Sequence, residues 1–189
     1  MATNNIKYTL TFFSDWHAGS GLSAGAETDA VVIKDSNNLP FLPGKTIKGL
    51  VRDALMDIAT MQKELVPTAV IERLLGKEVV INQETKSSFA GTLFFSNAHI
   101  PQGVANEISL KMSHHLYRTI ASTAIERNGI TKKGSLRSME VCIPIQLEGY
   151  IDGIDPEDIH FIDLAFKLIR HAGVGRNRGL GRCQFEIKS

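Results

Sequence analysis

The stretch from residue 170 to residue 182 places the strongest constraint on how this chain of 189 residues can fold. It contains two Gly-x-Gly pairs, Gly173/Gly175 and Gly179/Gly181, with arginines before, between and after them. Glycine adopts positive φ angles without steric cost and lets another backbone approach closely, so we expect a tight loop here. Arginine offers a planar, permanently charged fork that suits phosphate. The stretch is therefore either a loop that lies against a polyanion or a solvated turn between a helix and a strand.

Length and charge limit the possible functions. At 189 residues the chain fits a single domain, 1–189, with a sizeable core. Its net charge of +1 is far from the strongly basic balance of many nucleic-acid binders, so binding to a polyanion would have to use local clusters. Basic residues do cluster, at Lys45/Lys48/Arg52, at Lys132/Lys133/Arg137 and within 170–182. No apolar run could span a bilayer and the first residues lack a signal-peptide pattern, so we expect a cytoplasmic protein.

Alternating or short apolar runs predict strands over five segments: 6–13, 30–33, 91–96, 140–147 and 183–188. We expect 91–96 to be central in its sheet. Pro144 lacks an amide proton, so strand 140–147 should lie at an edge or carry a bulge. Cys142 and Cys183 fall within these alternations, which favours two buried free thiols over a disulfide or a zinc site.

Two stretches show the three- and four-residue spacing of an amphipathic helix, 44–61 and 155–172. The first carries Lys45 and Lys48 in its first turn, where cations oppose the helix dipole. Either an anion binds there or these lysines are simply solvated. A shorter helix is expected over 69–75. We expect Asp155 to cap the last helix and Gly173 to end it.

Residues 105–139 have few large apolar side chains and no regular spacing, so we interpret them as an inserted hairpin or long loop. They include His114-His115, which could be a general base pair or metal ligands. No carboxylate or cysteine accompanies the pair at ligand spacing, which favours ordinary surface histidines. Without this insertion the predicted order matches an α+β, ferredoxin-like βαββαβ core, with an antiparallel sheet and two helices on one face.

Three motifs give the chain a resemblance to the RAMP superfamily of CRISPR-associated proteins. They are His17-Ala18-Gly19-Ser20-Gly21 with the following segment 28–35, the proline- and glycine-led helix start 40–52, and the glycine-rich loop 173–183. A weaker fourth match covers 135–141. Within the superfamily the sequence is most similar to the backbone subunit of type III effector complexes.

The resemblance implies an RRM-like core with a thumb-like hairpin, which we map to 105–139. It also implies that copies associate along a guide RNA beside other CRISPR effector subunits, and that the thumb of one copy presses on the guide–target duplex held by the next. The aspartate proposed in the family to cut target RNA corresponds by position to Asp29.

A lone aspartate is a poor base at neutral pH because its unperturbed pKa is about 3.9. It is better suited to holding Mg²⁺, which commonly takes one or two carboxylates and phosphate oxygens. We therefore expect Asp29 to be the catalytic and metal-binding residue of a metal-dependent endoribonuclease that acts within the assembled complex, with Glu27 as a possible helper. The alternative is that Asp29 only caps the following strand.

For RNA binding we expect contacts to phosphate and sugar, independent of base sequence. The candidate residues are His17, Lys45, Lys48, Arg52, Lys132, Lys133, Arg137, Gly175, Arg176, Asn177, Arg178, Gly179 and Arg182. Two other functions remain open. One is a guide-RNA-processing endoribonuclease of the same superfamily, with His17 or His114 as base. The other is a non-catalytic scaffold that only grips the guide.

Overall fold

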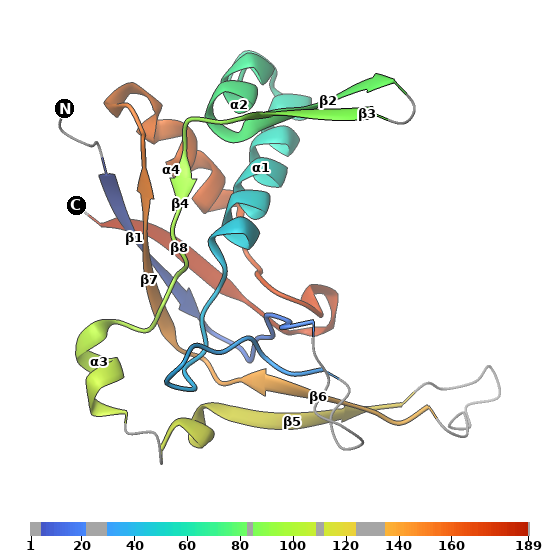
Figure 1. Ribbon diagram of the computed structural model, residues 1–189, viewed down its shortest axis with the longest axis vertical. Coiled ribbons are helices and arrows are strands. Elements are labelled where there is room, and N and C mark those ends of the chain that lie inside the picture. Colours follow the sequence, from blue (N-terminus) through green and yellow to red (C-terminus); the bar gives the residue numbers. More distant parts are fainter. Residues whose placement is uncertain (1–4, 22–29, 83–84, 109–111, 124–134, 189) are drawn as a thin grey trace.

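The computed structural model describes residues 5–21, 30–82, 85–108, 112–123 and 135–188. Four strands form an antiparallel sheet in the order β4-β7-β1-β8 (Figure 1). β1 (Asn5–Phe12) lies between β7 (Gln146–Asp152) and β8 (Cys183–Lys188), and β4 (Phe94–Phe95) pairs with the outer side of β7. The expected α+β class with an antiparallel sheet is confirmed.

Two helices, α1 (Gly44–Met61) and α4 (Ile159–Leu168), pack against each other and against the sheet (Figure 1). The predicted apolar stripe of α1 is buried at Ile47, Val51 and Leu55. A third helix, α2 (Thr68–Leu75), packs on α1, as expected for the segment after Pro67. Across the described ranges, no helix has both the length and the apolar character needed to span a membrane.

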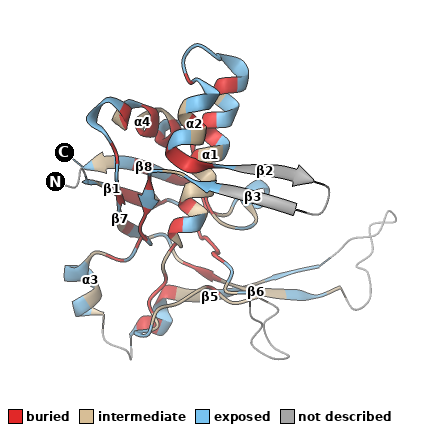
Figure 2. Cartoon of the chain, turned by 45° about the horizontal axis from the view of Figure 1, so that its top comes forward, coloured by how far each residue is buried: buried red, intermediate tan, exposed pale blue. Residues whose placement is uncertain are grey.

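Buried residues concentrate where the sheet meets α1 and α4 (Figure 2). Tyr8 in β1 lies at the centre, with its ring 5.4 Å from that of Phe166 and 6.0 Å from that of Phe185. A Cβ atom at Gly149, opposite Tyr8 in β7, would lie 2.4 Å from the tyrosine hydroxyl. The alternating apolar residues of β1 and β8 therefore point into the core, and the absence of a side chain at Gly149 leaves space for the Tyr8 ring.

Two hairpins project from the same side of the molecule (Figure 1). β5 (Tyr117–Ser122) pairs with β6 (Arg137–Cys142), so the segment 105–139 does contribute a hairpin. It follows a short helix, α3 (Gln102–Glu107), and the 3-10 turn Ser113–Leu116. The other hairpin, β2 (Gly76–Asn82) with β3 (Thr85–Ala90), was not predicted, because its sequence lacks a clear apolar alternation.

Three predicted strands were wrong in extent or position. Residues 30–33 make isolated bridges, from Val32 to Gly19 and from Ala30 to Met139, and form no regular strand. The segment 91–96 is not central, because only Phe94–Phe95 pairs and this pair lies at the sheet edge. The segment 140–147 belongs to two strands, β6 and β7, which separate around Pro144.

The last helix also differs from the prediction. α4 ends at Leu168, and Ile169 is already extended with φ −72° and ψ 110°. The chain leaves the helix because residues 170–172 pair with the end of the glycine loop: Cys183 N donates to Arg170 O at 2.9 Å and Ala172 N donates to Gly181 O at 2.9 Å. Asp155 precedes the 3-10 turn Pro156–Asp158, and its side chain makes no capping hydrogen bond.

Candidate nucleic-acid interface

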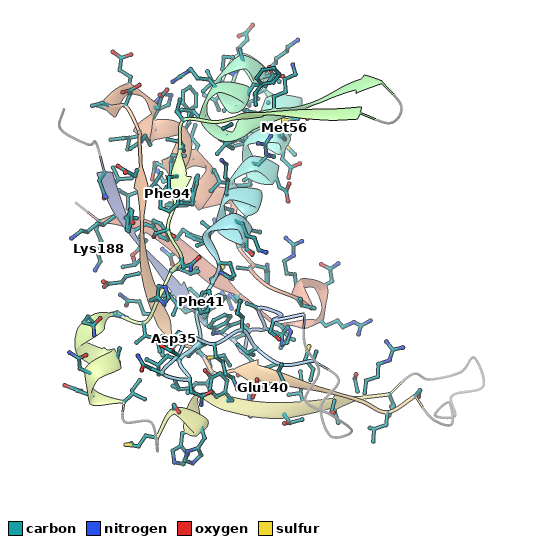
Figure 3. All side chains as sticks on the ribbon, viewed as in Figure 1. Asp35, Phe41, Met56, Phe94, Glu140 and Lys188 are labelled. Atoms are coloured by element: carbon teal, nitrogen blue, oxygen red, sulfur yellow. The ribbon has the colours of Figure 1, made fainter. Side chains whose placement is uncertain are left out.

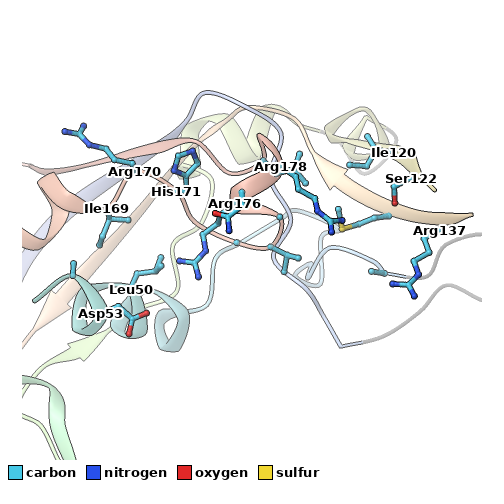
Figure 4. A pocket seen from close by; sticks show the side chains of 18 of the residues that line it. Leu50, Asp53, Ile120, Ser122, Arg137, Ile169, Arg170, His171, Arg176 and Arg178 are labelled. Atoms are coloured by element: carbon cyan, nitrogen blue, oxygen red, sulfur yellow. The ribbon is translucent and has the colours of Figure 1, made fainter. Parts of the chain in front are cut away.

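A groove with a volume of about 1270 Å³ lies between α1, the loop 170–182 and the β5–β6 hairpin (Figure 4). Each element contributes side chains to it. They include Leu50, Asp53 and Asp57 from α1, Arg170, Arg176 and Arg178 from the loop and its approach, and Ile120, Ser122 and Arg137 from the hairpin. The groove therefore has an acidic wall on the helix and basic walls opposite.

The glycine loop has a fixed shape. All four of its glycines have positive φ, between 71° and 93°, which fits the tight loop expected from the sequence. A Cβ atom at Gly173 would lie 2.4 Å from the carbonyl oxygen of His17, and one at Gly181 would lie 2.0 Å from that of Ala172. Val174 N donates to His17 O at 2.8 Å and Gly181 N to Asp15 O at 2.7 Å. These hydrogen bonds hold the loop against the residues that follow β1, so a loosely solvated turn does not describe it.

Trp16 explains why the residues after β1 are well placed to support the loop. The indole is fully buried, stacks on Phe12 with ring centroids 4.4 Å apart, and donates from Nε1 to Ile143 O at 3.2 Å. Asp15 next to it is 8% exposed and forms an ion pair with Arg118 of β5. The start of the His17 motif is thereby tied to the sheet, to the hairpin and to the glycine loop.

Four arginines of the groove, Arg137, Arg170, Arg176 and Arg178, have exposed side chains. In the part of the chain that the structure describes, none of these four makes a side-chain hydrogen bond or an ion pair. An unpaired guanidinium is a ready partner for phosphate because its charge and five donors are not engaged elsewhere. The groove can therefore accommodate an extended anion along its basic side.

Lys48 and Arg52 do not line this groove. Lys48 Nζ donates to Leu93 O at 3.4 Å, and its pKa is lowered by burial and then by the nearby Arg52 charge. Arg52 donates to the carbonyl oxygens of Leu75 and Gly76, so it satisfies carbonyl groups at the end of α2. Both side chains thus have internal partners, and their expected role in RNA binding gains no support from their position.

Lys45 is placed differently. It is exposed in the first turn of α1 and lines a smaller cavity of about 400 Å³ together with His17 and Arg176. The first turn of α1 contains no acidic residue, and Pro43 before it makes no side-chain cap. The positive end of the α1 dipole and the Lys45 charge therefore both favour an anion in this cavity.

Glu140 of β6 organises the segment that follows the small-residue loop (Figure 3). Its carboxylate accepts from Val32 N at 2.9 Å and from Lys34 Nζ at 2.8 Å, and its own amide donates to Ala30 O at 2.9 Å. Its carbonyl oxygen lies 2.7 Å from His17 Nδ1. Ala30 lines the groove. Sequence inspection missed Glu140, because an acidic residue in a polar position of a strand carries no local signal of such a role.

Not all of the expected site residues lie in the groove. Asp29, Glu27, Lys132 and Lys133 lie outside the described residues. Arg182 is exposed but does not line the groove, whereas Asn177 does. His114 and His115 are exposed with ring centroids 3.9 Å apart. Among the described residues, no group of three or more histidines, cysteines or carboxylates could hold a metal.

A family comparison agrees with the sequence motifs. A sequence model of the RAMP superfamily matches residues 9–184. The chain belongs to the RAMP superfamily. The match includes the His17 motif, the start of α1 and the whole glycine loop. A comparison with curated proteins gave no match.

Two of the solved structures with a similar fold come from type III-B complexes. One is a chain in "Cryo-EM structure of the Type III-B Cmr-beta bound to cognate target RNA", with a TM-score of 0.71 and 12% identity, over 97% of this chain and 96% of that chain. Another, in "Type III-B Cmr-beta Cryo-EM structure of the Apo state", has a TM-score of 0.66 and 11% identity over the same shares. At these identities the likeness shows the fold alone.

Proposed function

We propose that this RAMP protein is an RNA-binding backbone subunit of a type III CRISPR interference complex and that guide RNA lies in the groove. The observation that carries the proposal is the set of four exposed arginines without partners in the described structure, beside a loop of fixed shape. Contacts from these arginines go to phosphates, so binding does not depend on base sequence. The proposed partners are guide RNA, target RNA, other effector subunits and further copies of this chain.

The proposed core is ferredoxin-like. Along the chain its elements run β1, α1, β4, β7, α4, β8. In the sheet, β4, the second of these strands along the chain, lies at the edge beside β7, the third. This order, with both helices packed on the sheet, supports a βαββαβ unit. The β5–β6 hairpin is then an insertion between its second and third strands, in the place proposed for a thumb.

The acidic wall of the groove gives the RNA an orientation. Asp53 and Asp57 on α1 repel phosphates, whereas the arginines on the loop and the hairpin attract them. The sugar–phosphate backbone therefore runs along the loop side. The apolar groups of α1 that line the same groove, including Leu50 and Ala54, face the less charged parts of the nucleotides.

Asp29 is the proposed catalytic residue for cutting bound target RNA. Ala30, the next residue along the chain, lines the groove and is fixed by Glu140. Aspartate oxygens are suitable ligands for Mg²⁺ or another divalent cation, which would supply charge neutralisation at the phosphate when bound. In this proposal Asp29 would hold the ion together with RNA oxygens, with Glu27 as a possible helper.

Purification from the native host tests the assignment. We expect the protein in a multi-subunit particle that carries discrete guide RNAs. A particle containing Asp29→Ala should bind target RNA normally and leave it intact with Mg²⁺ present. Normal cutting by that particle contradicts the catalytic role of Asp29, and intact target RNA with the unsubstituted particle identifies a non-catalytic scaffold.

One observation favours a second function, the processing of guide RNA. Nδ1 of His17 lies at a carbonyl oxygen, which leaves Nε2 free to accept a proton at the cavity that Lys45 and Arg176 also line. His114, the other candidate base, is exposed next to His115, outside this cavity. Single-turnover cleavage of repeat RNA by the isolated protein without metal, lost in His17→Ala, would establish this function.

A further inference from the structure

The cavity beside the main groove contains a buried histidine whose outer nitrogen is not used by the protein. His17 is only 2% exposed, and within the described residues Nε2 has no hydrogen-bond partner. Gly19 lines the same cavity, and a Cβ atom at Gly19 would lie 3.3 Å from Nε2. The absence of a side chain at Gly19 thus leaves Nε2 accessible from the cavity.

The hydrogen bond on the other side of the ring fixes what Nε2 can do. Nδ1 lies 2.7 Å from the carbonyl oxygen of Glu140, and a carbonyl oxygen can only accept. Nδ1 must therefore carry the proton. In the neutral imidazole Nε2 then presents a lone pair, so it needs a ligand that donates a hydrogen bond.

The charged residues around His17 in the cavity carry a net positive charge, since Lys45 and Arg176 outnumber Asp53. Thr46 adds the first turn of α1, which is the positive end of the helix dipole. A ligand that fits both requirements offers a hydroxyl donor directly beside a phosphate. In a ribonucleotide the 2′-hydroxyl is adjacent to the 3′-phosphate, and DNA lacks this hydroxyl.

The geometry points to a ribose-reading subsite, in which His17 Nε2 accepts a hydrogen bond from a ribose 2′-hydroxyl while Lys45 and Arg176 bind the neighbouring phosphate. This inference rests on the proposed passage of RNA through the adjoining groove. It adds to that proposal a residue that distinguishes RNA from DNA. Arg176 lines both cavities, so one strand can contact the groove and the subsite together.

The test compares the affinity of the full chain for a single-stranded RNA and for the DNA of the same sequence, by fluorescence anisotropy. His17→Asn keeps an amide donor for Glu140 O and removes Nε2. Gly19→Ala keeps His17 and places a methyl group against Nε2; the φ of Gly19 is not positive, so alanine is compatible with the backbone. Each variant should lose about three- to tenfold in RNA affinity, the effect of one hydrogen bond, with DNA affinity unchanged.

Arg176→Ala is the matched control, because loss of a phosphate contact should weaken RNA and DNA binding alike. If His17→Asn fails to fold by circular dichroism, Gly19→Ala decides the outcome. Equal affinity of the unsubstituted chain for RNA and DNA, or unchanged discrimination in Gly19→Ala, overturns the ribose-reading role and leaves the proposed function intact. Binding to neither nucleic acid overturns both.

Discussion

The charge of the glycine loop can be tested by removing two arginines, Arg176 and Arg178. Both side chains are exposed, line the groove and lack an ion pair in the described structure. Their replacement by alanine should therefore change the free energy of unfolding by no more than about 0.5 kcal/mol. If Arg176→Ala/Arg178→Ala lowers the free energy of RNA binding by more than this amount, the loss reflects missing contacts with the RNA and not a weakened fold.

The expected size follows from counterion release. Each phosphate neutralised on a single strand contributes about 0.7 to the slope of log K against log salt. Two lost contacts should flatten the slope by about 1.4. If the affinities of the variant and the unsubstituted chain are equal near 1 M salt, the flatter slope lowers the affinity at roughly 0.1 M salt by about fivefold for each arginine removed. For the pair the loss is about 25-fold.

The assay is fluorescence anisotropy of a labelled single-stranded RNA over a series of salt concentrations. Lys7→Ala/Lys63→Ala is the matched control, since both lysines are exposed, do not line the groove and have no ion pair in the described structure. This control should leave the slope within about 0.3 of that of the unsubstituted chain. An equal loss of slope in both double variants would show that net charge drives binding, and would refute a specific role for the loop.

Three further predictions concern the walls of the groove, the thiols and the core. Asp53→Asn/Asp57→Asn should raise RNA affinity by about two- to fivefold at low salt, because two charges that repel phosphate are removed. A lower affinity in the same anisotropy assay would mean that these carboxylates bind the RNA through a cation. Burial raises the pKa of both Cys142 and Cys183 to about 12, so neither thiol should react with Ellman's reagent at pH 8 without denaturant, and fast labelling of the folded chain would contradict this. The free energy of unfolding should also fall as the pH rises above about 8.5, because only the unfolded chain loses these protons there. Gly149→Ala should destabilise the fold by about 2–4 kcal/mol in urea unfolding, because its methyl group would overlap the Tyr8 ring, whereas Gly103→Ala, with open space around the added methyl group, should be nearly neutral.

Much of the framework could be predicted because local patterns decide it. Alternation identified β1 and β8, the apolar stripe identified α1, and the Gly-x-Gly spacing identified a tight loop. Alternation failed over 140–147, because the apolar residues Ile143 and Ile145 continue the pattern although the chain changes sheets between them. The end of α4 was also missed, because pairing of residues 170–172 with the loop, a tertiary effect, ends that helix before Gly173.

The site was less predictable than the fold. Lys48 and Arg52 are basic residues of the same helix as Lys45, and only the tertiary fold gives them carbonyl partners. These are Leu93 O for Lys48, and Leu75 O and Gly76 O at the end of α2 for Arg52. Glu140 has its role through long-range contacts that no local pattern reveals. The free nitrogen of His17 likewise depends on a carbonyl more than a hundred positions away in the chain.

Photo-cross-linking tests most directly whether RNA lies in the groove. The sheet offers a rival surface on the face away from α1 and α4, where Phe94 and Tyr150 are exposed and lie near Lys188 (Figure 3). With 4-thiouridine-containing RNA and mass spectrometry, we predict cross-links in the peptides that contain 170–182 and 137–142. Cross-links confined to the strands that carry Phe94, Tyr150 and Lys188 would contradict the proposed interface.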